Sequence, residues 1–213
     1  MKQIPFYVIF ISLLFLASCS LFLNSDKSIY HKCFFIAEDT FNIEGEIFVN
    51  DKLTAKADFE KITIKAGLWG WEIEGSKTSG NKYTVTVNVN ANGITLPPVE
   101  NARYKDRKTD LNSDISISDF PYVLTFYVDG RTTRNAISPE LGSYYYIYMP
   151  EAIDLSREFV EEIDSGWGDY KIYAYYNYNF SRPGWYKLYS ADEPIKNNSA
   201  YSSGKNTKIR APE

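Results

Sequence analysis

The chain has 213 residues, and its 23 Lys and Arg against 27 Asp and Glu give a formal net charge of −4. These charges are spread in short mixed runs with no basic stripe, so the sequence excludes nucleic acid as an expected partner. Tyrosine occurs 18 times and tryptophan 4 times, whereas histidine occurs once. Such a Tyr-rich, β-branched composition favours strands and binding faces over helical bundles.

The N-terminal residues predict an export signal. A basic Lys2 precedes an apolar run that begins at Ile4 and ends in Leu16-Ala17-Ser18-Cys19. These last four residues resemble the lipobox of bacterial lipoproteins, in which the leader, here residues 1–18, is removed as a signal peptide. The resemblance implies a lipid on Cys19, a new N-terminus open to acylation such as palmitoylation, and anchoring in the cell envelope. Ser20 follows this cysteine directly. A residue of this kind at that position resembles lipoproteins that are sent to an outer membrane rather than retained at an inner one.

Two alternatives to lipidation stay open. Residues 4–23 have about the length needed to cross a bilayer as an uncleaved anchor. In a plain secreted protein, Cys19 and Cys33 could instead form a disulfide. If Cys19 carries the lipid, Cys33 loses its only partner in the chain and is expected to pack as a small buried hydrophobe.

Residues 19–37 are expected to be the lipidated cysteine and a tether, and a domain is expected over residues 38–190. Segments 43–49 and 53–59 flank a turn and predict a hairpin, followed by strands at 61–65 and 69–73. Segment 83–89 alternates most clearly. It places Tyr83, Val85, Val87 and Val89 on one face and Thr84, Thr86 and Asn88 on the other, as in a sheet with one solvated side.

The second half begins with residues 90–119, a long polar stretch that predicts an interdomain linker or a large surface loop. Residues 122–137 predict a hairpin across Asp129-Gly130, and a further strand follows at 144–149. A 3.6-residue period predicts a helix from about 150 to 163. Strands are then expected at 170–180 and 185–189, and residues 191–213 are expected to be a polar, frayed tail.

The number of short strands predicts a mainly β protein, an antiparallel β-sandwich with one short helix. Gly168-Asp169-Tyr170 resembles the start of strand F in immunoglobulin-like domains, where a tyrosine caps a corner through its hydroxyl. The resemblance implies an immunoglobulin-like sandwich. A division near residue 105 would leave two halves with marginal cores, so we favour one domain.

The residue pattern argues against an enzyme. The single histidine, His31, is placed in the expected tether, which leaves no Ser-His-Asp or Cys-His arrangement on a rigid element. We therefore predict no catalytic residues and no cofactor. Hydrolysis by paired carboxylates stays as the least favoured alternative, because the pairing of acids is three-dimensional.

The segment from Asp110 to Asp114 matches the first half of a calcium-binding loop. The match then fails, because Ile115 stands where glycine is needed and Pro121 where a bidentate glutamate is needed. We predict no metal site of this type. A different calcium site, with ligands among Asp110, Asn112, Asp114 and Asp119, stays as the alternative to an ordinary polar loop.

The aromatic residues near the C-terminus are the best candidates for function. On a strand over 170–180, Tyr173 and Tyr175 share one face with Lys171, Asn177 and Asn179, the residue types that stack on sugars or anchor protein partners. Trp167 and Trp185 flank this strand in glycine-rich turns. The sequence therefore predicts a ligand-binding platform of Trp167, Tyr173, Tyr175 and Trp185. The predicted function is a binding or adhesion module for a protein or glycan, with a structural or assembly lipoprotein of the envelope as the alternative.

Overall fold

The computed structural model describes residues 26–50, 52–66, 71–89, 102–120, 122–133, 136–138, 142–164, 169–196 and 207–212. The predicted leader, Cys19 and the alternative anchor at 4–23 lie outside these residues. Within the described part of the chain, no helix has the length and hydropathy needed to cross a bilayer. The chain divides into a large unit, residues 28–159 and 174–213, and a small unit that includes residues 26–27, 160–164 and 169–173.

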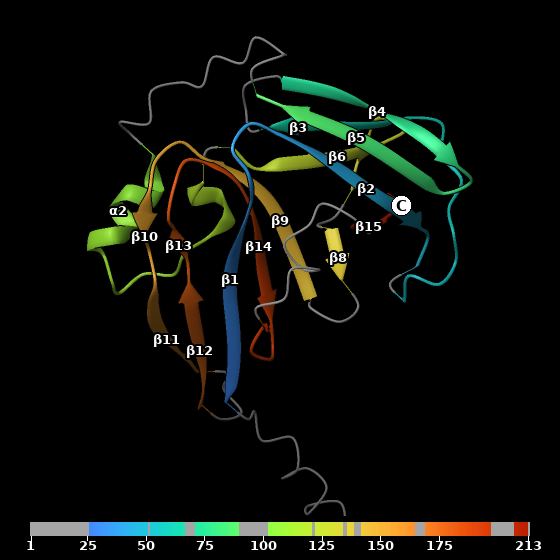
Figure 1. The fold of residues 1–213 in the computed structure, drawn as a ribbon. Coiled ribbons are helices and arrows are strands. Elements are labelled where there is room, and N and C mark those ends of the chain that lie inside the picture. Colours follow the sequence, from blue (N-terminus) through green and yellow to red (C-terminus); the bar gives the residue numbers. More distant parts are fainter. Residues whose placement is uncertain are drawn as a thin grey trace, which may run out of the picture. The chain divides into compact units, whose positions relative to one another are not determined.

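Strands make up most of the fold, as predicted (Figure 1). The first sheet consists, from edge to edge, of β11 (Arg157–Asp164), β12 (Asp169–Asn177), β1 (Lys27–Ala37), β14 (Gly184–Ala191), β9 (Gly142–Met149) and β8 (Ala136–Ser138). The second consists of β15 (Thr207–Arg210), β2 (Thr40–Phe48), β5 (Lys82–Asn88), β4 (Trp71–Ser79), β3 (Ile62–Ala66), β6 (Leu124–Val128) and β7 (Arg131–Thr132). The short strands β10 (Ile153–Asp154) and β13 (Asn179–Phe180) form a third, two-stranded sheet.

In the large unit, the two sheets enclose a common core and form a sandwich-like arrangement. Val85 and Val87 of β5 join Phe126 of β6 and Trp185 of β14 in one cluster of buried residues. The alternation predicted for β5 is confirmed, because Tyr83, Val85, Val87 and Val89 are all at most 6 % exposed. An immunoglobulin-like arrangement is not confirmed.

The first sheet is buried on its other face as well. Of residues 90–119, which we expected to be a linker or surface loop, residues 90–101 lie outside the described residues, and the rest include helix α2 (Arg103–Thr109) and the 3-10 turn η3 (Ile117–Asp119). Tyr104, Ile115 and Phe120 of this segment pack with Met149 and Tyr186 of the sheet in a second core cluster. We call residues 102–120 the cover. The predicted loop is thus an ordered layer, because its few apolar side chains are spaced to reach the sheet.

The helix predicted over 150–163 is wrong, since this segment forms β10 and β11. Its apolar residues fit two periods at once. Phe159 and Ile163 are four residues apart, a spacing that suits a helix and a strand alike. In β11 both are partly buried, as is Arg157, whereas Glu158 and Glu162 are exposed. A short helix lies instead in the polar stretch, as α2.

Both ends of the expected domain extend further than predicted. The expected tether contains β1, which pairs antiparallel with β14 from Tyr30 to Ala37. The expected frayed tail contains β15, which pairs parallel with β2, and Ile209 is fully buried. Gly45 permits this pairing, because a Cβ there would lie 2.0 Å from the Thr207 carbonyl oxygen.

The two predicted hairpins have different outcomes. Asp129 and Gly130 both have positive φ, 50° and 78°, and connect β6 to β7 as the Asp-Gly signal predicts. Beyond Thr132, however, the chain leaves this pair and contributes β8 to the first sheet. Residues 53–59 do not form the predicted strand. They contact β2 through a single bridge between Phe48 and Lys56.

Candidate functional site

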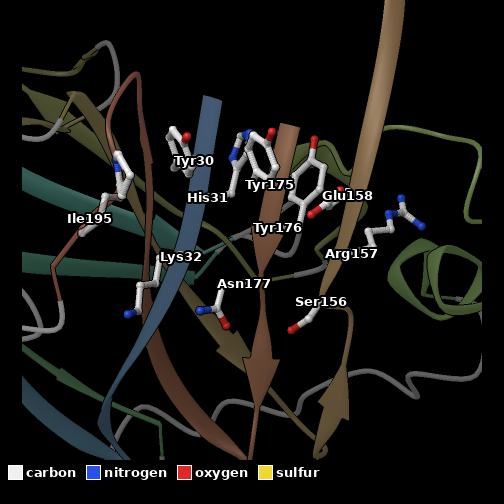
Figure 2. A pocket seen from close by; sticks show the side chains of 11 residues that line it. Tyr30, His31, Lys32, Ser156, Arg157, Glu158, Tyr175, Tyr176, Asn177 and Ile195 are labelled. Atoms are coloured by element: carbon white, nitrogen blue, oxygen red, sulfur yellow. The ribbon is translucent and has the colours of Figure 1, made fainter. Parts of the chain in front are cut away.

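A groove of about 480 Å³ lies over β1, β11 and β12 in the large unit (Figure 2). Two tyrosines form its centre, Tyr30 of β1 and Tyr175 of β12, with ring centroids 4.9 Å apart and planes inclined by 11°. Both side chains are partly exposed. The groove is lined by Tyr30, His31, Lys32, Ser156, Arg157, Glu158, Tyr175, Tyr176, Asn177, Pro194 and Ile195.

Strand alternation sorts these residues into two faces. Tyr30 and Lys32 share one face of β1, and Tyr175 and Asn177 share the corresponding face of β12. The intervening His31 and Tyr176 stack on each other on the opposite face, with centroids 4.3 Å apart. The groove therefore presents a stacked tyrosine pair beside an ammonium and an amide, with Pro194 and Ile195 also in its lining.

The structure places the four predicted platform residues in different environments. Tyr175 lies in the groove, and Tyr173 is half-buried in the small unit. Trp167 lies outside the described residues. Trp185 is fully buried in the sandwich core, in tilted contact with Phe41, so its predicted place on an exposed platform is wrong. Gly184 before it has a φ of 137°, and both faces of β14 are covered.

The sequence prediction missed Tyr30 and Lys32, because both were assigned to a tether. A usable signal was present in the run from Ile29 to Ile36, which is rich in aromatic and β-branched residues. Cys33 in this run is a free thiol that donates to the Asn179 carbonyl at 3.4 Å. Burial raises its pKa to about 12, which agrees with the predicted role as a packed hydrophobe.

His31 occupies a packed position rather than a tether. Its ring stacks on Tyr176, and its Nδ1 lies 3.3 Å from the Tyr178 hydroxyl. Burial lowers the pKa of His31 to about 4, although the nearby Asp114 carboxylate opposes this shift. The imidazole is therefore neutral near pH 7 and serves as an aromatic packing element.

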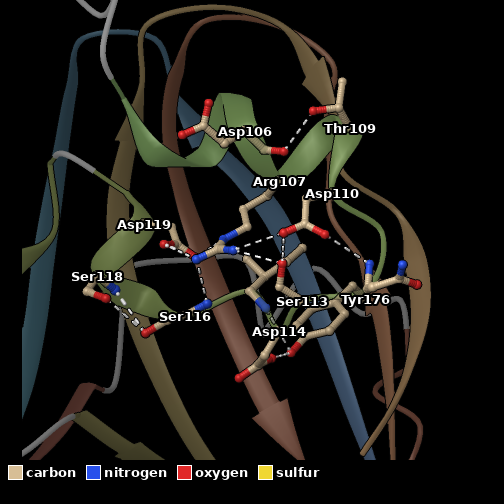
Figure 3. A network of polar contacts seen from close by, with 12 residues as sticks. Asp106, Arg107, Thr109, Asp110, Ser113, Asp114, Ser116, Ser118, Asp119 and Tyr176 are labelled. Atoms are coloured by element: carbon tan, nitrogen blue, oxygen red, sulfur yellow. Dashed lines mark hydrogen bonds and ion pairs between the residues drawn. The ribbon is translucent and has the colours of Figure 1, made fainter.

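The cover is held together by a polar network around Arg107 (Figure 3). The Arg107 guanidinium donates to both carboxylate oxygens of Asp119, from Nε at 3.0 Å and from Nη2 at 3.2 Å. Asp119 also accepts from the Ser116 backbone N–H at 2.9 Å, which caps η3. This bidentate pair explains how the Asp119 carboxylate can be almost completely buried.

The acids of the alternative calcium site are bound by protein groups, and Arg107 pairs with two of them, Asp110 and Asp119. Asp110 accepts from the Ser113 hydroxyl and the Asn112 backbone N–H, Asp114 accepts from the Tyr176 hydroxyl, and Asp119 accepts from Arg107. In the ranges that the structure describes, no group of three or more His, Cys, Asp or Glu is placed to hold a metal ion. These oxygens position the cover.

A second cavity, of about 280 Å³, lies between the cover and the first sheet. Its wall includes Ile115, Ile117 and Phe120 of the cover and Tyr145 and Leu188 of the sheet. The ring of Phe120 meets Tyr178 edge-on at 6.1 Å. This cavity marks the margin at which the cover and the sheet stop packing closely.

Arg157 connects the cover to β11. Its Nη1 donates to the carbonyls of Arg107 and Asp110, both at 2.6 Å, and its Nη2 donates to the Ser113 carbonyl. Its guanidinium also lies 5.9 Å from the Tyr176 ring centroid. The planar Arg157 guanidinium thus binds three backbone carbonyls of the cover.

We expect Arg157→Ala to lower the free energy of unfolding by about 2–4 kcal/mol, because three carbonyls lose a charged donor. Arg157→Lys should recover little, since an ammonium cannot reproduce the fork. Urea unfolding of both variants measures this. Arg103→Ala is the control, because Arg103 is exposed on the same cover. An Arg157→Ala midpoint equal to that of Arg103→Ala would contradict the assigned role.

Comparisons of the chain with protein-family models, curated proteins and solved structures find no match.

Proposed function

We propose that this chain is a lipid-anchored binding module of the bacterial envelope, and that the groove over β1, β11 and β12 engages its protein or glycan ligand. The observation that carries the proposal is the partly exposed Tyr30–Tyr175 stack inside a concave surface of about 480 Å³. This volume lies within the range of about 300–1,000 Å³ that is usual for ligand sites. Aromatic rings flanked by a few polar groups are the usual lining of such sites.

The chemistry of the groove favours binding over hydrolysis. Among the described residues that line it, Glu158 is the single carboxylate. Hydrolysis of a glycosidic bond by the usual route needs two carboxyl groups on either side of that bond. His31, the other group suited to proton transfer, directs its ring to the opposite face of the sheet and packs against Tyr176.

The anchor rests on the leader and on Leu16-Ala17-Ser18-Cys19. Six residues, 20–25, separate Cys19 from the first described residue, Asp26. Six residues span at most about 20 Å when fully extended. A lipid on Cys19 would therefore keep the domain close to the bilayer surface, and an outer-membrane location is our expectation from Ser20.

Cys19→Ala should remove the chain from the membrane fraction, because the thiol that accepts the lipid is lost. Labelling with a radioactive fatty acid, followed by gel fluorography, measures the lipid directly. Cys33→Ala is the matched control and should be labelled like the wild type. Labelling of the Cys19→Ala chain, or its retention in washed membranes, would contradict the anchor.

The binding function is tested with full-length protein in proteoliposomes and envelope fractions of the producing cells. We expect Tyr175→Ala to reduce binding about tenfold and Asn177→Ala to reduce it severalfold, because both side chains line the groove. Tyr127→Ala should bind like the wild type, since Tyr127 is partly exposed on β6, in the second sheet. Equal binding by all variants would contradict the proposal and favour an assembly role. Protease shaving of whole cells separates surface display from a periplasmic location.

A further inference from the structure

The tyrosine pair of the groove offers an unusual combination of surfaces. Because the rings of Tyr30 and Tyr175 stack on each other, each covers one face of the other. Both rings remain partly exposed within the groove. The pair therefore gives the groove an apolar strip that carries two hydroxyl groups. A pyranose ring has the complementary pattern, with a C–H face bordered by hydroxyls.

The polar side chains beside this strip both donate and accept hydrogen bonds. Asn177, two residues from Tyr175 in β12, has an amide that does both. Lys32 of β1 supplies donors, and Glu158 of β11 supplies acceptors. Sugar hydroxyls also donate and accept, so such a mixed set can satisfy several hydroxyls of one ring. If these side chains were all donors or all acceptors, about half of the hydrogen bonds to the sugar hydroxyls would be lost.

The groove has no large excess of positive or negative charge. Its lining holds the cations Lys32 and Arg157 and the anion Glu158. The Arg157 guanidinium donates to three carbonyls of the cover and in Figure 2 points away from the tyrosine pair. One ammonium and one carboxylate then remain beside the rings. A site for a polyanion would need an excess of positive charge.

The dimensions favour a small ligand over a protein surface. A stable protein interface takes about 800 Å² and about 20–30 residues from each partner. In the described part of the chain, 11 residues line the groove, which is concave. We propose, resting on the binding function above, that the groove holds a short segment of a neutral glycan, with one sugar ring packed on the Tyr30–Tyr175 pair and its hydroxyls bound by Asn177, Glu158 and Lys32.

The test is calorimetric titration of the full-length lipidated chain in detergent with neutral oligosaccharides of two to six hexose or N-acetylhexosamine units. Acidic oligosaccharides and an extended peptide library serve as competing ligands. We expect binding of at least one neutral series, reduced tenfold or more by Tyr175→Ala and severalfold by Asn177→Ala. Tyr175→Phe should bind nearly as well as the wild type, because stacking needs the ring. Tyr127→Ala should be unchanged, and circular dichroism confirms that each variant is folded.

The outcomes separate this inference from the proposed function. If only acidic oligosaccharides or peptides bind, and Tyr175→Ala abolishes that binding, the ligand is not a neutral glycan. The groove then remains a binding site. Binding of neutral glycans that Tyr175→Ala and Asn177→Ala leave unchanged would overturn the assignment to the groove. If no neutral oligosaccharide series binds, the inference that the groove holds a neutral glycan is wrong. Envelope binding that still depends on Tyr175 would then leave the proposed function standing.

Discussion

Trp185→Ala is expected to lower the free energy of unfolding by about 3–5 kcal/mol, because it removes the largest fully buried side chain of the sandwich core. The indole meets Tyr148 edge-on at 5.3 Å and lies 5.5 Å from Phe41, so neighbouring rings would border the resulting cavity. For a domain of this size, such a loss lowers the melting temperature by roughly 6–20 °C. Thermal unfolding followed by circular dichroism measures it.

The same substitution separates two roles for Trp185. On an exposed platform, its removal would reduce ligand binding and change stability by at most about 0.5 kcal/mol. In the core, it should destabilise the fold, and Trp185→Phe should recover part of the loss because an aromatic ring still fills most of the space. A stable Trp185→Ala variant with weakened binding would therefore contradict the core position.

The failed prediction for Trp185 has a clear physical cause. Glycine and proline in Ser181–Gly184 identify a turn, but a turn does not determine which face the next residue takes. Alternation usually answers that question, as it does along β5, where Thr86 is exposed between the buried Val85 and Val87. Along β14 it cannot, because six consecutive residues from Gly184 to Tyr189 are all buried.

Other parts of the fold were predictable for equally physical reasons. The Asp129-Gly130 turn was correct because few residues besides glycine and aspartate adopt two successive positive φ values. The helix over 150–163 was not, since apolar residues four apart, such as Phe159 and Ile163, fit a helical stripe as well as one face of a strand. Only the sheet neighbour decides between these periods. That neighbour is β12, and β11 is placed beside it by tertiary structure rather than by local sequence.

One half of the groove could be predicted from the sequence, and the other half could not. Tyr175 could be selected from alternation within β12. Its partner Tyr30 lies about 145 positions earlier in the chain, and no local pattern reveals that β1 inserts between β12 and β14. The same insertion carries His31 from an expected tether to a stack on Tyr176. Sites built from one strand are thus visible in the sequence, whereas sites built across strands need the topology.

Lys187→Met is expected to raise the free energy of unfolding near pH 7 by about 1–4 kcal/mol, because a buried ammonium is replaced by an apolar side chain of similar length. Lys187 is 3 % exposed, and its Nζ lies 4.3, 5.2 and 5.5 Å from the ring centroids of Tyr144, Tyr146 and Tyr189. Burial lowers the pKa of Lys187 to about 7 in the folded state, against about 10.4 in an unfolded chain.

The pH dependence follows from this difference. Between about pH 7 and 10 the unfolded state holds the Lys187 proton and the folded state does not, so stability rises with pH. Below about pH 7 both states are protonated, and the cost of the buried charge is constant. Buried tyrosines such as Tyr83 and Tyr146 have raised pKa values, which lowers stability only above about pH 10.

Urea unfolding of the wild type and Lys187→Met at intervals from pH 6 to 9.5 measures the effect. The difference between the two proteins should be largest below pH 7 and should shrink toward pH 9.5, because only Lys187 differs between them. Lys82→Met is the control, since Lys82 is exposed on β5 and its substitution should leave the pH profile unchanged. A difference that stays constant across the range would show that Lys187 keeps an ordinary pKa. The amine would then have to reach solvent through the ring of tyrosines in the folded state.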